Sequence, residues 1–127
     1  MQPPEDTGFG PHVGVRVVAR GDGSARAVLD AGPEHLNPHG VVHGGALATL
    51  VDHTMGAAVY TVLTAGESCA TVSVSLTFIA PARPGSIQCE AVVVRRTRQL
   101  VALQAVVRQE EKVIAEALGS YVVLPPS

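Results

Sequence analysis

The sequence contains few of the residues that characterise nucleic-acid-binding proteins, disulfide-bonded domains or metal sites. Aromatic residues make up 3% of the 127 residues and the net charge is −2, so the chain offers neither rings for base stacking nor a basic surface for phosphates. Its two cysteines, Cys69 and Cys89, fall in or beside predicted strands without a metal-binding or redox spacing. We therefore expect a reduced, cytoplasmic protein that binds no nucleic acid.

The sequence also lacks signals that would place it in a membrane. Residues 1–12 are polar and rich in proline and glycine, unlike a secretory signal peptide. The apolar segment 44–65 has the length of a membrane span, but Asp52, His53 and several threonines interrupt it. We expect this segment to be a buried helix of a soluble protein.

What is present fits one domain with a sizeable core, given the length and the 46% hydrophobic content. We expect a flexible N-terminus over 1–11 and a single domain over 12–127. One long helix and an antiparallel sheet curled around it would give an α+β fold. Alternating polar and apolar residues predict the strands of this sheet at 13–20, 24–31, 71–78, 87–94, 100–108 and 113–124.

The stretch from Asn37 to Asp52 joins a turn to the start of the long helix. Pro38 biases Asn37 away from helical geometry, and Gly40 tolerates a positive φ, so the chain should turn here. From Gly44 onward the apolar residues follow helical spacing. Because nearly every side of this helix is small or apolar, we expect it to be enclosed.

Asp52 is the only formal charge in the predicted helix, and an enclosed carboxylate needs a partner or a task. A hydrogen bond to a nearby hydroxyl such as Thr49 is the structural alternative. The pair Gly44-Gly45 favours a task, because a ligand can approach the free N–H groups that open the helix. Those groups and the helix dipole suit an oxygen that is gaining negative charge, as in acyl transfer.

The spacing of these groups adds a constraint. Asp52 follows Gly44 by eight residues, which is about 12 Å along one helix. One carbonyl group cannot contact both, since each reacting group must lie at roughly 3 Å. If both act on one substrate, the acid must come from a second chain whose helix runs antiparallel. We therefore predict an obligate homodimer with two shared sites.

The pattern Asn37, His43-Gly44-Gly45 and Asp52, followed by the run from Thr71 to Pro81, resembles the hotdog-fold acyl-CoA thioesterases. It is most similar to the branch of the phenylacetate-pathway thioesterases. The similarity runs from about residue 36 to 124, and the spacing around His-Gly-Gly makes it fairly specific. It implies a hotdog fold that hydrolyses an acyl- or aryl-CoA thioester to free acid and coenzyme A, with no cofactor and no metal.

The resemblance also implies roles for individual residues. The Gly44 amide would be the oxyanion donor, and Asp52 of the other subunit would be the nucleophile or general base. Asn37 and Thr71 would place water or the thioester. Strict alternation points Thr71 away from the helix, so its role requires a twist or bulge at the start of its strand.

Other residues are candidates for holding the substrate. Arg83, Arg96 and Arg98 lie in predicted turns, where they are either solvated or attract the phosphates of coenzyme A. Gly45 lies beside the expected oxyanion donor. Met55, with small residues around it, could border an acyl pocket whose shape the sequence leaves open.

His43 has more than one interpretation. It could be a general base, but we expect its imidazole to pack at the helix entrance and orient the loop or the substrate. His35, His39 and His43 are spaced by four, which on a helix would suggest metal ligands. Pro38 and Gly40 disfavour a helix there, so we predict no metal site.

Two other functions stay open, a hydratase or dehydratase that pairs His43 with Asp52 and a non-catalytic acyl-CoA-binding module. The predicted sheet also has apolar residues on its outer face, and a second interface covering them would give a dimer of dimers. These residues are Val92, Val94, Val106, Val122 and Leu124.

Overall fold

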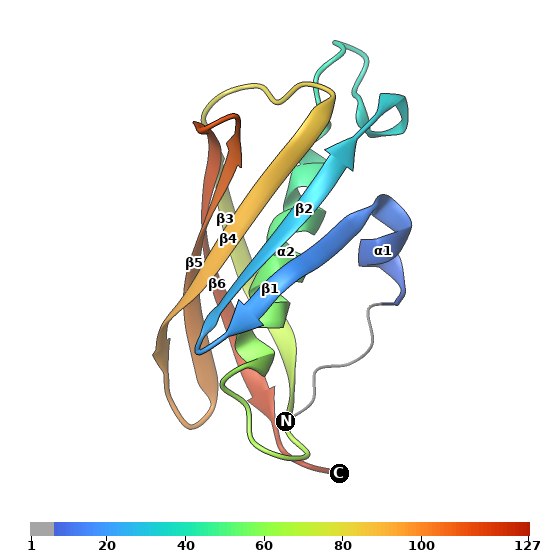
Figure 1. The fold of residues 1–127 in the computed structure, drawn as a ribbon. Coiled ribbons are helices and arrows are strands. Elements are labelled where there is room, and N and C mark those ends of the chain that lie inside the picture. The colour runs from blue at the N-terminus through green and yellow to red at the C-terminus, as the bar shows by residue number, and fades with distance from the viewer. Residues whose placement is uncertain (1–6) are drawn as a thin grey trace.

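The structure is a computed structural model that describes residues 7 to 127, and it consists of one sheet curved around one long helix (Figure 1). This arrangement confirms the expected α+β hotdog fold. In chain order the elements are α1 (Phe9–Val13), β1 (Val15–Gly21), β2 (Ser24–Ala31), the short 3-10 helix η1 (Pro33–His35), α2 (Gly44–Tyr60), β3 (Ser68–Phe78), β4 (Gly85–Arg96), β5 (Leu100–Gln109) and β6 (Lys112–Leu124).

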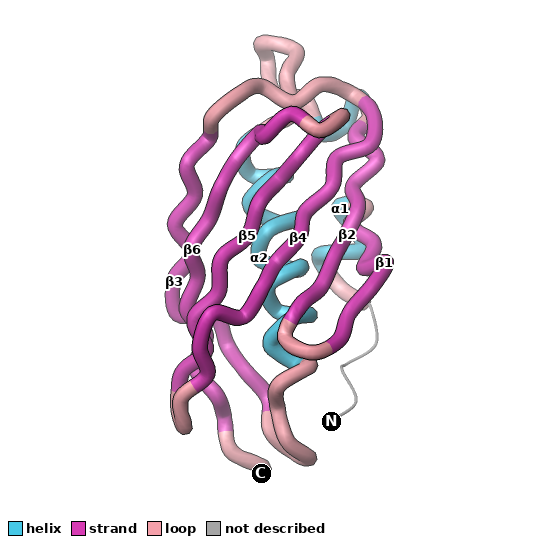
Figure 2. Tube along the Cα trace, turned by 60° about the vertical axis from the view of Figure 1, so that its left-hand side comes forward, coloured by secondary structure: helices cyan, strands magenta, loops and turns pink. Residues whose placement is uncertain are grey.

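The six strands form one antiparallel sheet in the order β1-β2-β4-β5-β6-β3. β3 follows α2 in sequence but lies at the far edge from β1, where β6 is its neighbour (Figure 2). The chain therefore crosses the inner face of the sheet between β2 and β3. α2 makes this crossing and packs against strands from both halves of the sheet.

The core lies between α2 and the inner face of the sheet. Leu47, Leu50 and Val51 on α2 are buried against inward-facing strand residues such as Leu29 and Ile87. Because side chains alternate across a strand, each strand gives one set of residues to this core and leaves the other set outside. Apolar burial between the two layers thus fixes α2 on the sheet.

One side of α2 is not covered by the protomer. We call it the open strip, and it consists of residues that recur every three or four positions: Gly45, Ala48, Thr49, Asp52 and Gly56. Gly45 and Asp52 are exposed, and a Cβ atom added to Gly56 would meet no atom within 4 Å. The expectation of an enclosed helix is therefore wrong for a single protomer. Small residues are as typical of a core as of a contact surface, and on this side of α2 they border open space.

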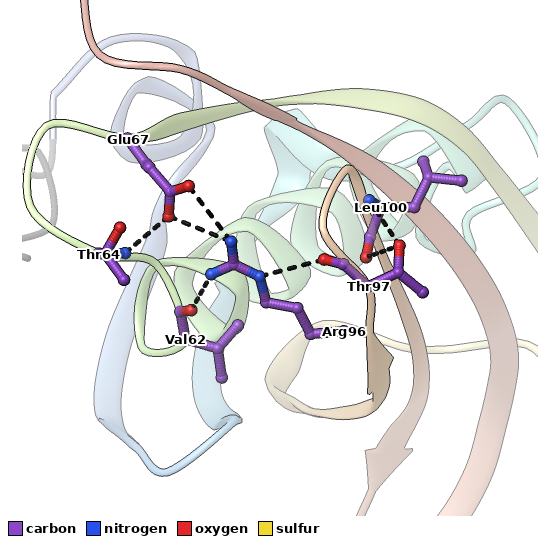
Figure 3. Close-up of polar contacts among 6 residues, drawn as sticks. All are labelled: Val62, Thr64, Glu67, Arg96, Thr97 and Leu100. Atoms are coloured by element: carbon purple, nitrogen blue, oxygen red, sulfur yellow. Dashed lines mark hydrogen bonds and ion pairs between the residues drawn. The ribbon is translucent and has the colours of Figure 1, made fainter.

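α2 ends at Tyr60, before the predicted end at residue 65. At this end the backbone amides of Thr61 and Val62 reach carbonyls three residues back, those of Ala58 and Val59, and side chains also bond carbonyls here. The hydroxyl of Thr61 donates to the carbonyl of Ala58 at 2.7 Å, and the guanidinium of Arg96 donates to the carbonyl of Val62 (Figure 3). Apolar periodicity continues past this point, so it could not reveal the helix end.

Residues 9–11, at the end of the segment 1–11 that we expected to be flexible, are helical. Residues 1–6 lie outside the described residues, but Phe9 begins the short helix α1. Gly10 in this helix packs against α2 so closely that a Cβ atom there would lie 2.3 Å from the His53 ring. In the described part of the chain, no helix is both long and apolar enough to cross a membrane.

Candidate active site

The loop before α2 has the predicted turn. The Asn37 side-chain oxygen accepts hydrogen bonds from the backbone N–H groups of His39 at 2.9 Å and Val41 at 3.3 Å. Gly40 takes the positive φ of 80° that the turn requires. The Asn37 amide nitrogen donates no hydrogen bond to any residue from 7 to 127. Asn37 therefore shapes the loop with its oxygen and keeps its two donors available.

α2 begins with a cap that leaves one amide open. The His43 Nδ1 accepts the N–H of Gly45 at 2.8 Å, and the N–H groups of Ala46 and Leu47 reach the His43 carbonyl. Of the four amides that open the helix, only that of Gly44 has no partner among the described residues. Because Nδ1 accepts, the proton of the neutral His43 ring lies on Nε2. The predicted oxyanion donor is thus the one amide that the cap does not use.

Gly44 also lies against an aromatic ring. A Cβ atom added to Gly44 would approach the Cζ of Phe78, at the end of β3, to 3.3 Å. Phe78 itself is 54% exposed, so its ring covers the helix start without burying it. An open amide, the positive end of the helix dipole and an apolar wall therefore meet at the start of α2.

Asp52 is held by two hydroxyl groups from two strands. Its Oδ1 accepts from the Thr71 hydroxyl at 2.9 Å and from the Tyr121 hydroxyl at 2.5 Å. Its Oδ2 accepts no hydrogen bond from any described residue. The alternative partner Thr49 is wrong, because its hydroxyl donates to the Gly45 carbonyl at 2.8 Å.

The strand register explains how Thr71 reaches Asp52. The pairing of β3 with β6 shifts between Thr71 and Ser73, which is the irregularity that the family role required. The shift breaks the strict alternation that would turn Thr71 to the outer face together with Ser73. Thr71 therefore points to α2, as its proposed role requires.

The ionisable groups beside Asp52, Tyr121 and Cys69, are held in their neutral, protonated forms. Burial, followed by the hydrogen bond to Asp52 and the charge of that carboxylate, raises the pKa of Tyr121 far above its usual value. Burial and then the Asp52 charge raise the pKa of Cys69 to about 11. Burial raises the pKa of Cys89 to about 12. Both cysteines are therefore thiols at neutral pH, and neither supplies a thiolate nucleophile.

The three turn arginines differ in how the protomer uses them. The Arg96 guanidinium donates to the carbonyls of Val62 and Thr97 and to both oxygens of Glu67 (Figure 3). The Arg83 backbone is clamped by the Gln109 side chain at 2.9 and 2.7 Å. The side chains of Arg83 and Arg98 make no ion pair or hydrogen bond with the rest of the described chain. Arg96 therefore holds a turn, and the other two remain open to a ligand.

Two further predicted residues are placed away from the open strip. Met55 is completely buried, and its Sδ lies 2.5 Å from where a Cβ atom on Gly119 would be. His35 uses both ring nitrogens, since Nδ1 accepts from the Gly32 amide and Nε2 donates to the Val13 carbonyl. Within residues 7–127, no three His, Cys, Asp or Glu side chains converge on a metal site. Met55 is thus a core residue of the protomer, and its place beside an acyl pocket stays a prediction.

The residue that sequence reasoning missed is Tyr121. Apolar alternation placed it in the last strand, where a tyrosine is an ordinary core residue. One signal was available, since a buried tyrosine hydroxyl usually has a hydrogen-bond partner. That rule could not say which residue the partner would be.

The chain matches the profile of one protein family, and solved structures resemble it over most of its length. The profile of the thioesterase superfamily matches residues 39–116. A conserved protein from Pseudomonas aeruginosa is 30% identical, with 95% of this chain and 100% of that chain covered and a TM-score of 0.91. A putative thioesterase from Ralstonia eutropha JMP134, described as phenylacetic acid degradation-related, is also 30% identical, with 88% and 86% covered and a TM-score of 0.82.

A mutant of the phenylacetic acid degradation protein PaaI from Thermus thermophilus is 25% identical. The alignment covers 88% of this chain and 95% of that one, with a TM-score of 0.82. A comparison with curated protein sequences found no significant match.

Proposed function

Since the chain belongs to the thioesterase superfamily and is a thioester hydrolase, we propose that it hydrolyses an acyl-CoA thioester at a site shared by two protomers. One observation carries this proposal. The Gly44 amide, which has no partner among residues 7–127, lies at the end of the open strip, and the Asp52 carboxylate lies within it about 12 Å further along the same helix. A single protomer cannot bring both to one carbonyl group.

A second copy of the chain would complete the site. β3 is an edge strand with exposed apolar side chains, among them Val72 at 60% exposure. Antiparallel pairing of two β3 edges would continue the sheet and lay two open strips against each other. The small residues Gly45, Ala48 and Gly56 would let the helices approach closely. Gly44 of one chain would then face Asp52 of the partner subunit.

The reaction follows from these positions. The substrate carbonyl oxygen would accept the Gly44 N–H, where the helix dipole stabilises the negative charge that develops. Asp52 of the partner subunit would either take a proton from an attacking water or attack the carbonyl carbon itself. In the first route water replaces coenzyme A as the C–S bond breaks; in the second the Asp52–acyl anhydride that replaces the C–S bond is then hydrolysed by water. In both routes the proton that leaves the water goes to the thiolate, so coenzyme A leaves as the thiol and the acyl group as the acid. Heavy oxygen from water that enters the enzyme in a single turnover would identify the covalent route.

The remaining residues would position the substrate. The free amide donors of Asn37 and the Nε2–H of His43 would bind water or the thioester, with Gly45 beside them. Because Nδ1 of His43 is occupied by the cap, a role as donor fits it better than a role as base. Arg83 and Arg98 would attract the phosphates of coenzyme A, whereas the guanidinium of Arg96 is already engaged.

The assembly we propose is a dimer of dimers. On the outer face Val92, Val94 and Leu124 are exposed at 41%, 62% and 39%, in addition to Leu118 at 64%. A second interface would cover these side chains. A solution mass of two chains at low concentration would count against the tetramer. A cytoplasmic location belongs to the same proposal and is supported by two free cysteines.

The decisive experiment is a panel of aliphatic and aryl acyl-CoA substrates with detection of free thiol. We expect thiol release that is saturable in at least one substrate. Loss of enoyl absorbance without thiol release would indicate a hydratase. Tight binding of acyl-CoA without any thiol release would indicate a binding module and contradict the proposed hydrolysis.

A further inference from the structure

The Asp52 carboxylate is held from inside the protein by a residue beyond the matched family region. Tyr121 lies on β6, after residue 116 where the superfamily match ends. Tyr121 is 2% exposed, and its hydroxyl contacts both the Asp52 Oδ1 at 2.5 Å and the Asp52 backbone oxygen at 3.0 Å. A core residue thus reaches an exposed acid.

The sheet register brings the two hydroxyl donors together. Thr71 on β3 and Tyr121 on β6 are direct cross-strand partners, immediately before the register shift of β3. Cross-strand partners lie about 5 Å apart, so both side chains can reach the same atom on the helix above them. The result is that Oδ1 receives two hydrogen bonds and Oδ2 receives none from the described residues.

Two donors on one carboxylate oxygen fix the orientation of the group. An sp² oxygen offers two lone-pair directions, and on Oδ1 both are used. Rotation of the carboxylate would break both charge-assisted hydrogen bonds and leave the Tyr121 hydroxyl only the neutral Asp52 backbone oxygen at 3.0 Å. Since burial and the neighbouring carboxylate raise the pKa of Tyr121, its hydroxyl is protonated at neutral pH and can act as a donor.

We propose that Tyr121 is a positioning residue for the acid of the site. Together with Thr71 it holds Oδ1, so that Oδ2 is the oxygen that meets the attacking water or the acyl carbon. This inference rests on the proposed function, because it assumes that Asp52 is the acid. Tyr121 contacts neither substrate nor water in this scheme and acts only through Asp52.

Replacement of Tyr121 by phenylalanine tests this role, because it removes the hydroxyl and keeps the ring in the core. We expect kcat to fall on the order of 10- to 100-fold, the value of one hydrogen bond to a charged group, with KM within about 2-fold. Ser120→Ala is the matched control. It removes a hydroxyl from the neighbouring residue of β6, whose partner is Ser73 at 3.2 Å, and should leave kcat unchanged.

The same substitution in an Asp52→Asn background separates positioning from general damage. If Tyr121 acts through Asp52, the double variant should keep the residual rate of Asp52→Asn within about 2-fold. Equal losses of kcat in both backgrounds, or no loss in either, would overturn the inference. If Asp52→Asn itself keeps full turnover, the proposed function fails instead.

A second variant keeps the test valid if Tyr121→Phe does not fold. Thr71→Val removes the other donor to Oδ1 at an exposed position. We expect the same pattern, a lower kcat with KM nearly unchanged and no further loss in the Asp52→Asn background. If Thr71→Val changed KM but not kcat, the inference that Thr71 and Tyr121 position Asp52 by binding Oδ1 would be contradicted.

Discussion

The two groups on which the proposed chemistry depends are supported in different ways. The carboxylate of Asp52 is fixed by Thr71 and Tyr121, whereas the amide of Gly44 is defined by what the His43 cap leaves unused. A hydrolytic site needs both an acid that is held in position and a hydrogen-bond donor that is free to bind the substrate oxygen.

Replacement of Asp52 by asparagine keeps the shape of the side chain and removes its basicity. We expect turnover of the best acyl-CoA substrate to fall on the order of 10²- to 10⁴-fold, with the oligomeric mass unchanged. Asp30→Asn is the matched control, since Asp30 is an exposed acid that pairs with Arg16 at 2.9 Å on the other half of the sheet. Full activity of the Asp52 variant would remove this residue from the mechanism.

Among single residues, the sequence alone could identify those that break a pattern. Asp52 is a charge in an apolar helix and Gly44 opens a glycine pair, so both could be found without coordinates. Tyr121 obeys the alternation of its strand and gives no such signal. Met55 was expected to border a pocket, and in the protomer its sulfur packs against Gly119 in the core. Pairwise packing of this kind is not encoded in periodicity.

At the level of secondary-structure elements, an ion pair and hydrogen bonds hold the loop that follows α2. Arg96 reaches from the end of β4 to the Val62 carbonyl and to Glu67, joining the β4–β5 turn to the loop before β3 (Figure 3). The sequence showed three basic residues around this turn, Arg95, Arg96 and Arg98. It could not show which one the protomer would engage, because the contacts come from a loop about 30 residues away.

This loop should make stability depend on pH. The backbone N–H of Thr64, then its hydroxyl and Arg96, lower the pKa of Glu67 below its ordinary value of 4.5. A lowered carboxylate pKa stabilises the folded state above the unfolded pKa and is lost as the pH falls through the folded pKa. Glu67→Gln should therefore lower the melting temperature at pH 7, and the difference should shrink as the pH falls below 4.5 and disappear below the lowered pKa of Glu67. A difference that does not vary with pH would contradict this origin.

For the whole molecule, the topology followed from the order of elements. Hairpin, helix and four strands imply a sheet wrapped around a helix, and the structure has that form. What the sequence could not provide is the side of α2 that the sheet leaves uncovered. Small residues such as Ala48 and Gly56 fit a core and an interface equally well, so only the folded protomer separates the two.

A shared site predicts complementation between two inactive chains. We expect Asp52→Asn homodimers and Gly44→Val homodimers to have little activity. Random reassembly of equal amounts should form heterodimers with one intact site, restoring about one quarter of the wild-type activity. The measurement is thiol release after co-refolding, with each homodimer refolded alone as the control. Absence of any recovery, with heterodimers shown to form, would place Gly44 and Asp52 in separate or single-chain sites.

The open strip has a consequence for the protein at very low abundance. If the site is shared as proposed, a single copy holds a Gly44 amide and an Asp52 carboxylate that cannot act on the same substrate, so it should be inactive. Dimerisation would then activate the enzyme. The specific activity should decline when the protein is diluted below the dissociation constant of the dimer. Expression level would in this way set a threshold for the reaction, without any separate regulator.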